Sequence, residues 1–371
     1  MRNILFLFLA FALFSCESGD KDANKGTNAD STTVATNPVN LILLIGDGMG
    51  VSQMSASFYF AENTNLVRFN NIGFINTSSA SHKVTDSGAG GSAFAIGEKT
   101  YNGAIGVGMD SLSRTNIVEY LSKMNYKAGV VATSQITHAT PAVFYSHVKS
   151  RKMYDEIAVQ LVHSEVDFFA AGGTDYFLRR EDGINYMDSL KAFGFEIDTM
   201  SLDKNFDAQK KYGFLMAPNA MPAMTENRGD FLPKATSKAI EYLSAGDSPF
   251  FLMVEGSQID WAGHDNNKDY LVAEMLDFDK VIGVAMDFAE KDGNTLVIVL
   301  ADHETGGFTL SASHAEGMKG DYNVIDPSFA TSGHSAALIP VLAFGPGSEL
   351  FRGFYQNNEI YAKMIKTVEN K

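Results

Sequence analysis

Ser87 is the residue whose neighbours best suit it to act as a nucleophile. It lies in Thr85-Asp86-Ser87-Gly88, where a polar segment gives way to small residues that predict the start of a helix. The first turn of a helix favours an anionic substrate, because its backbone N–H groups are unpaired and its dipole end is positive. Serine, threonine and aspartate are also common N-cap residues, so the segment taken alone favours a helix cap. Gly88, Gly90 and Gly91 predict a loosened helix, because each glycine costs roughly 0.5–1 kcal/mol relative to alanine.

Other residues have the types and spacing of metal ligands. Asp260 and His264 are four apart and would share one face of a helix, although the spacing taken alone favours a polar stripe on a surface helix. The candidates with mixed nitrogen and oxygen donors are Asp47, Asp260, His264, Asp302, His303 and His334, and the hard oxygen candidates are Thr140 and Glu255. The first set suits zinc and the second suits Mg²⁺. Two metal ions about 4 Å apart would clamp the attacking and leaving oxygens of a phosphoryl group.

Several of these candidate ligands directly follow apolar segments that have the pattern of buried strands. Apolar runs at 40–46, 250–254 and 295–301 end directly at Asp47, Glu255 and Asp302, and the run 127–133 precedes a segment that contains Thr140. Strands buried on both faces and alternating with amphipathic segments predict an α/β fold, with a mainly parallel central sheet and helices on both faces. The carboxyl ends of such strands form the usual ligand-binding edge. We also expect a strand at 338–345 and a closing helix at 358–368.

The charge of the chain restricts its partners. Its 371 residues carry a formal net charge of -15, which argues against nucleic-acid binding because the nucleic-acid backbone requires a positive surface. The same charge opposes anionic substrates at long range. A phosphate site must therefore hold its own positive charge, from metal ions or an arginine.

The first residues predict export. Arg2 is followed by an apolar run at 4–14, which is too short to span a bilayer as a helix. The run leads to Cys16, the only cysteine of the sequence. This pattern resembles a bacterial lipobox, so we predict a lipoprotein signal peptide at 1–16 and a lipid anchor at Cys16. The alternative is a cleavage site with an incidental cysteine. The polar segment 17–37 predicts a flexible tether, and 38–371 a catalytic domain with a short loop excursion at 311–331.

Taken together, these segments resemble the alkaline phosphatases, in particular the short, cold-active bacterial type. The resemblance runs from Asn40 nearly to the C-terminus, with its motifs in the family order. They are Asp47-Gly48-Met49-Gly50, Thr85-Asp86-Ser87, Thr100-Tyr101-Asn102-Gly103, His138-Ala139-Thr140-Pro141, Glu255-Gly256-Ser257-Gln258-Ile259-Asp260, Asp302-His303-Glu304-Thr305-Gly306-Gly307 and Gly333-His334-Ser335. The fold that it implies is a three-layer sandwich, with helices on both faces of a large, mainly parallel sheet.

The resemblance implies hydrolysis of phosphate monoesters through a phosphoserine on Ser87, with two Zn²⁺ and one Mg²⁺ per subunit. It also assigns the ligands. Asp260, His264 and His334 would hold the first zinc, Asp47, Asp302 and His303 the second zinc beside Ser87, and Asp47, Thr140 and Glu255 the Mg²⁺. Arg151 matches the phosphate-binding arginine of the family, whose planar guanidinium can bind two phosphate oxygens at once.

Two positions depart from some bacterial members. His138 and Trp261 stand where those members have Asp and Lys, and we expect both side chains to lie just outside the ligands. Losing the lysine predicts weaker retention of phosphate and faster turnover. His138 leaves the identity of the metal at the Mg²⁺ position open.

Other functions remain compatible with the motifs. A phosphodiesterase shares the machinery, whereas a sulfatase is disfavoured because its modified cysteine is absent and Cys16 lies in the signal. A lipoprotein that binds metal or phosphate without turnover is a third possibility. The resemblance also implies a homodimer and small-molecule phosphate monoesters as substrates. With the signal peptide, it places the protein in the periplasm or on the cell envelope.

Overall fold

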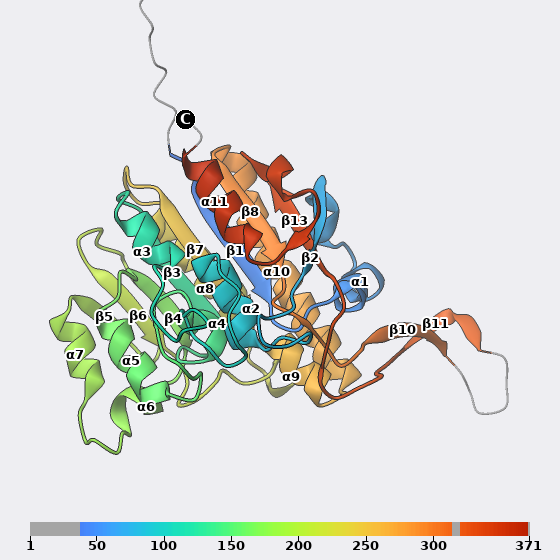
Figure 1. Ribbon diagram of the computed structural model, residues 1–371, viewed down its shortest axis with the longest axis horizontal. Coiled ribbons are helices and arrows are strands. Elements are labelled where there is room, and N and C mark those ends of the chain that lie inside the picture. The colour runs from blue at the N-terminus through green and yellow to red at the C-terminus, as the bar shows by residue number, and fades with distance from the viewer. Residues whose placement is uncertain (1–37, 314–319, 370–371) are drawn as a thin grey trace, which may run out of the picture. The chain divides into compact units, whose positions relative to one another are not determined.

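The computed structural model describes residues 38–313 and 320–369. The predicted signal peptide, Cys16 and the tether 17–37 lie outside the described residues. A ten-stranded sheet forms the centre of the domain, in the order β14-β2-β13-β8-β1-β7-β3-β4-β6-β5 (Figure 1). Its strands are β1 (Asn40–Gly46), β2 (Asn71–Asn76), β3 (Lys127–Gln135), β4 (Phe168–Gly172), β5 (Phe195–Asp198), β6 (Lys211–Leu215), β7 (Phe250–Gly256), β8 (Thr295–Leu300), β13 (Ile339–Phe344) and β14 (Gly353–Gln356).

The sheet is parallel except at β13, which runs antiparallel to both β2 and β8. β1 lies between β7 and β8, with Gly46 opposite Gly256 and Ile45 opposite Leu300. All residues of β7 and β8 are buried, as the apolar runs predicted for strands covered on both faces. Because these three strands end together, the polar residues that follow them meet at one edge of the sheet.

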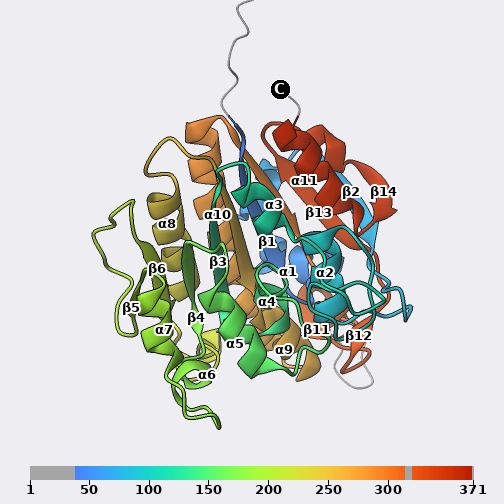
Figure 2. The same cartoon turned by 60° about the vertical axis from the view of Figure 1, so that its left-hand side comes forward.

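Helices cover both faces of the sheet (Figure 2). They are α1 (Val51–Phe60), α2 (Ser87–Ile96), α3 (Ile117–Ser122), α4 (Ala139–Ala142), α5 (Tyr154–Val162), α6 (Asp175–Leu178), α7 (Tyr186–Ala192), α8 (Phe231–Leu243), α9 (Gln258–His264), α10 (Lys268–Asp292) and α11 (Glu359–Glu369). α8 and α10 pack together on one face, whereas α2 contacts α3, α4 and α11 on the other. The predicted three-layer architecture is confirmed.

Two small sheets add to this core. The segment 311–331, which we expected to be a loop, contains most of an antiparallel hairpin formed by β10 (Thr309–Ser313) and β11 (Asp321–Ser328). Its Gly, Asp and Ser content concealed the pairing. β9 (Glu304–Thr305) pairs with β12 (His334–Ser335), with His334 opposite Thr305. Strands of two residues are too short to show a sequence period, yet this pair brings two predicted ligand segments together.

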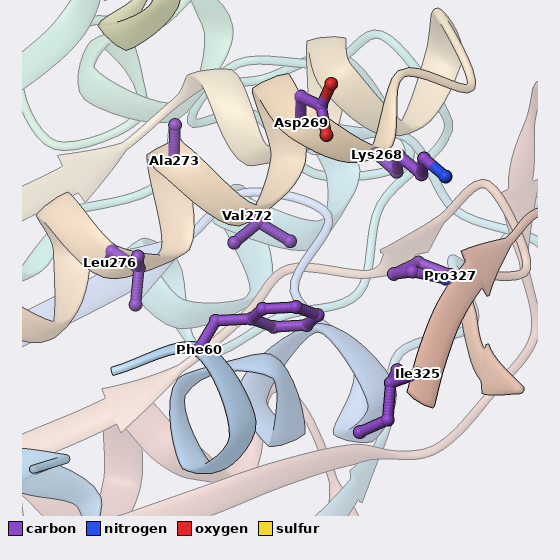
Figure 3. A pocket seen from close by; sticks show the side chains of 8 residues that line it. All are labelled: Phe60, Lys268, Asp269, Val272, Ala273, Leu276, Ile325 and Pro327. Carbon is purple, nitrogen blue, oxygen red and sulfur yellow. The ribbon is translucent and has the colours of Figure 1, made fainter. Parts of the chain in front are cut away.

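A cavity of about 360 Å³ lies apart from these strand ends, between α1, α10 and β11 (Figure 3). Its lining is mostly apolar and includes Phe60, Val272 and Ile325, with Lys268 and Asp269 as its charged members. None of the predicted site residues lines it.

Candidate active site and metal centres

Ser87 is the first residue of α2, and Asp86 is the N-cap. The Asp86 carboxylate accepts hydrogen bonds from the backbone N–H groups of Ala89, at 3.0 Å, and Gly103, at 2.9 Å. Asp86 therefore does the capping that the sequence had left open to Ser87. The Ser87 hydroxyl is 1% exposed, and its oxygen lies 3.3 Å from His303 Nε2.

The first cluster of metal-ligand side chains contains Asp260, His264 and His334. Asp260 and His264 share one side of the helix α9, as their spacing predicted, and His264 Nε2 lies 3.4 Å from Asp260 Oδ1. His334 comes from β12, with its Nε2 atom 3.2 Å from His264 Nε2 and 3.5 Å from Asp260 Oδ1. A hydrogen bond to Asp260 raises the pKa of His264 to about 9. Two imidazoles and one carboxylate that converge in this way form a zinc-type donor set.

The second cluster contains Asp47, Asp302 and His303, and all three side chains are buried. His303 Nε2 lies 3.1 Å from Asp302 Oδ2 and 3.5 Å from Asp47 Oδ1. Burial opposes ionisation of His303, but Asp302 outweighs it, and the pKa of His303 is raised. The His303 ring stacks on His334, with ring centroids 3.6 Å apart, so the first and second clusters adjoin each other.

The third cluster contains Asp47, His138 and Glu255. Thr140 also lies here, and its hydroxyl donates to Asp47 Oδ2 at 3.3 Å. His138, which we expected just outside the ligands, has a ring nitrogen within 4.8 Å of an oxygen of each carboxylate. Burial lowers the pKa of His138 to about 3, so its ring is neutral at ordinary pH.

Some buried carboxylate oxygens in these clusters accept no hydrogen bond from the described residues, and this indicates whether the clusters suit cations. Among the described residues, no N–H or O–H group donates a hydrogen bond to Asp47 Oδ1 or Glu255 Oε1. Burial and the neighbouring acids raise the pKa of Asp47 well above its ordinary range, and burial raises that of Glu255 to about 7. Unpaired buried carboxylates are costly unless a cation compensates them. The donor atoms therefore fit bound metal ions.

Arg151 supplies a fixed cation beside Ser87. Its Nη1 atom donates to Asp86 Oδ2 at 3.0 Å, and its Nη2 atom lies 3.1 Å from His138 Nε2. Its backbone N–H donates to Gly103 O at 2.7 Å, so the loop that carries Arg151 is joined to the loop that Asp86 also binds. Burial opposes the charge on Arg151, but Asp86 outweighs it and raises the pKa of the guanidinium.

Comparison with known proteins identifies the family. The family model of alkaline phosphatase matches residues 39–325. The chain belongs to the alkaline phosphatase family. It is 33% identical to alkaline phosphatase 3 of Bacillus subtilis, with 89% of each chain covered. Metal-dependent hydrolysis of phosphate monoesters is the function of this family.

Solved alkaline phosphatases have the same fold. The enzyme from the Antarctic bacterium TAB5 is 52% identical, with a TM-score of 0.88 over 90% of this chain and 98% of that one. The cold-active alkaline phosphatase of Shewanella sp. is 30% identical, with a TM-score of 0.80 over 89% of this chain and 99% of that one. The family predicted from the sequence is confirmed.

Every predicted alkaline phosphatase site residue lies in or beside the three clusters. Trp261 is partly buried, and its ring packs edge-on against His138, with centroids 5.9 Å apart. Sequence reasoning missed Asp86, although it directly precedes Ser87, and it missed Thr305, whose hydroxyl contacts Asp260 and His303. Between residues 38 and 369, outside the undescribed 314–319, no helix has the length and apolarity needed to cross a membrane.

Proposed function

We propose that Ser87 is the nucleophile of this alkaline phosphatase and carries the phosphoryl group during turnover. The observation that carries the proposal is the position of its buried hydroxyl, in the first turn of α2 and 3.3 Å from His303 Nε2. The first-turn N–H groups and the helix dipole favour the negative charge that develops there. Asp86 caps the helix, so the hydroxyl is free to react.

The reaction proceeds in two displacements. Ser87 Oγ forms a bond to phosphorus as the ester P–O bond breaks, and the alcohol leaves with a proton. Water then attacks the phosphoserine, releases inorganic phosphate and returns a proton to Ser87. Arg151 binds non-bridging phosphate oxygens through its planar fork, and its ion pair with Asp86 holds that fork in place. Because Arg151 is fully charged at all working pH values, it also offsets the charge of the substrate.

The metal assignment follows the clusters. The first cluster would hold one Zn²⁺ and the second cluster the other, whereas Asp47, Glu255, Thr140 and His138 would surround Mg²⁺. When bound, these ions would supply Lewis-acid stabilisation of charge on the attacking and leaving oxygens. A TAB5 mutant with a histidine replaced by glutamate has Mg bound in its M3 site, which supports a magnesium-type third site here.

The deciding experiment compares wild-type protein with Ser87→Ala, each reconstituted with zinc and magnesium. We expect the variant to keep its metals but to lose the phosphate burst and roughly three orders of magnitude or more in turnover. Ser57→Ala is the matched control, because Ser57 is equally buried, lies in α1, and its hydroxyl makes no hydrogen bond to the described residues. A burst that persists in Ser87→Ala would refute the assignment. Rates on an aryl phosphate monoester and diester would separate a monoesterase from a diesterase.

We also propose that the chain is exported to the periplasm or cell envelope and anchored by a lipid on Cys16. The apolar run that ends at a sole cysteine supports this. Cys16→Ser should release the enzyme from the membrane fraction, and unchanged fractionation would refute the anchor.

We propose, finally, that the enzyme is a homodimer. The family resemblance implies a dimer, and exposed apolar side chains on α1 and β11 support it. Phe58 and Tyr59 end α1, and Tyr322 and Val324 lie on β11, each about half or more exposed. Clusters of exposed apolar residues commonly mark protein interfaces.

A further inference from the structure

One buried hydroxyl contacts a proposed zinc ligand from the first cluster and another from the second cluster. Thr305 lies in β9 and is fully buried. Its Oγ1 atom donates to Asp260 Oδ1 in the first cluster and lies 3.2 Å from His303 Nδ1 in the second. This single hydroxyl therefore joins the side chains of Asp260 and His303.

The proton arrangement at Thr305 follows from its single hydrogen. Because the carboxylate can only accept, the hydroxyl hydrogen points to Asp260. The contact with His303 must then run the other way, with Nδ1–H donating to the Thr305 oxygen. This leaves His303 Nε2 as the atom that faces the second cluster.

The other two histidines are oriented in the same manner, but by backbone groups. His264 Nδ1 lies 2.7 Å from the Ser332 carbonyl, and His334 Nδ1 lies 2.8 Å from the Thr85 carbonyl. In each ring Nδ1–H is engaged outside the cluster and Nε2 is presented to it. Of these three histidines, His303 is the one whose Nδ1–H donates to a side chain. That acceptor, the Thr305 hydroxyl, can therefore be removed by substitution.

Packing holds the Thr305 side chain in this rotamer. A Cβ atom built on Gly48 would lie 2.8 Å from Thr305 Oγ1, and one on Gly263 would lie 3.0 Å from its Cγ2. The backbone N–H of Thr305 donates to Gly48 O at 3.1 Å. The hydroxyl and the methyl group therefore face different glycines at close range, and exchanging them would bring the methyl group against Asp260.

We propose that Thr305 is a positioning residue that holds Asp260 and His303 in their metal-binding orientations and thereby links the two zinc sites. The proposal rests on the proposed function, because it takes the two clusters as zinc sites. Outer hydrogen-bond partners of metal ligands commonly contribute 10–100-fold to metal affinity. Thr305 acts through Asp260 and His303 and does not itself touch the substrate.

Zinc affinity, measured by competition with a chromogenic chelator, tests this without relying on activity. We expect Thr305→Val to bind zinc roughly 10–100-fold more weakly than wild type, and Thr305→Ser to bind as wild type. Thr236→Val is the matched control, because Thr236 is a buried threonine whose hydroxyl bonds only to Leu232 O within α8. It should bind zinc as wild type. If Thr305→Val does not fold, the smaller Thr305→Ala decides, with the same expected loss.

Two outcomes overturn the proposal. One is wild-type zinc affinity in Thr305→Val or Thr305→Ala, and the other is a Thr305→Ser variant as weak as Thr305→Val, since the hydroxyl then has no role. Asp260→Ala separates this result from a failure of the proposed function. If Asp260→Ala also binds zinc normally, the metal assignment itself is wrong; if it binds weakly, only the role of Thr305 is refuted.

Discussion

Asp86 and Ser87 have separate roles, although the sequence allowed Ser87 to be either the helix cap or the nucleophile. Asp86 is the cap, and Ser87 is the proposed nucleophile. Asp86 accepts bonds from Ala89, Gly103 and Arg151, so it caps α2, orders a loop and holds the guanidinium in place. Although burial opposes ionisation, Arg151 and these backbone donors lower the pKa of Asp86. The carboxylate therefore stays charged at any pH at which the enzyme would work.

Neutralising this carboxylate should weaken phosphate binding. Asp86→Asn keeps the size of the cap but loses the ion pair, and hydrogen bonds to charged groups contribute about 1.5–3 kcal/mol. We expect kcat/KM on a phosphate monoester to fall roughly 10–100-fold, with weaker inhibition by inorganic phosphate. Asp110→Asn removes a similar partner from Arg114 at an exposed position and should change neither value. Equal kinetics in the two variants would contradict the role of Asp86.

His138 sets the chemistry of the third cluster. It places a neutral imidazole beside the Asp47 and Glu255 carboxylates, and Mg²⁺ prefers oxygen ligands to nitrogen. His138→Glu should therefore raise Mg²⁺ affinity by roughly tenfold or more, as measured by titration calorimetry. His163→Glu, at a histidine outside the three clusters, is the control. Unchanged Mg²⁺ affinity in His138→Glu would show that this ring does not face the ion.

The helix α2 contains glycines at positions where its close packing leaves little room for a side chain. Every residue of α2 is buried, and the structure shows close packing where the glycines had predicted a loosened helix. A Cβ atom on Gly90 would lie 3.0 Å from the Asp302 carbonyl oxygen, whereas one on Gly91 would meet Val143 Cγ2 at 3.2 Å. Backbone beside a metal ligand yields less readily than a side chain.

The two glycines should therefore respond differently to alanine. Gly90→Ala pushes Asp302 and should lower the free energy of unfolding by roughly 1–3 kcal/mol, together with zinc content. Gly91→Ala should cost less and should keep its zinc. Urea unfolding and metal analysis of the purified variants measure both quantities. Equal losses would mean that helix propensity, which the two substitutions share, governs this segment.

A second element-scale feature joins α3 to the Arg151 loop. Both ring nitrogens of His147 face acceptors, with Nδ1 2.7 Å from Gly106 O and Nε2 2.9 Å from Glu119 Oε1. Burial alone would lower the pKa of His147, but the hydrogen bond to Glu119 outweighs it and the pKa is raised. The stabilisation is therefore fully present below the ordinary histidine pKa and is lost as pH rises through the raised value.

This brace predicts a pH dependence of stability. Between about pH 6 and about pH 9, wild-type protein should lose unfolding free energy that Glu119→Gln does not lose, because the variant lacks the charged partner. Urea unfolding of both metal-loaded proteins across this range isolates the difference. Parallel curves would exclude His147 as the group that titrates.

The whole molecule carries a strongly negative net charge, whereas the proposed active site must bind a negatively charged phosphate. The net charge of -15 contrasts with the partly buried Arg151 and with three clusters, at one edge of the sheet, that could hold metal cations. Positive charge is therefore local, and small phosphate esters that reach this edge fit it better than a polyanion does.

The proposed dimer belongs to this scale. Tyr322→Ser, with or without Phe58→Ser, should shift the mass measured by size-exclusion chromatography with light scattering from dimer toward monomer. Each exposed aromatic side chain at an interface core contributes on the order of 1–2 kcal/mol or more. Met200→Ser is a control, since Met200 is as exposed as Tyr322, at 86%, and lies elsewhere. A wild-type mass in the Tyr322 and Phe58 variants would exclude this surface.

The sequence alone was enough to predict the sheet, the strand ends that carry Asp47, Glu255 and Asp302, and the helical pairing of Asp260 with His264. These predictions depend on continuous apolar runs, on the 3.6-residue period of a helix and on the shared edge of parallel strands. The tertiary contacts were needed to show that Asp86 is the cap, that His138 lies at the third cluster and that Thr305 contacts two of the predicted ligands. Those contacts join segments far apart in the chain, and their distances depend on register and loop path, which no local pattern encodes.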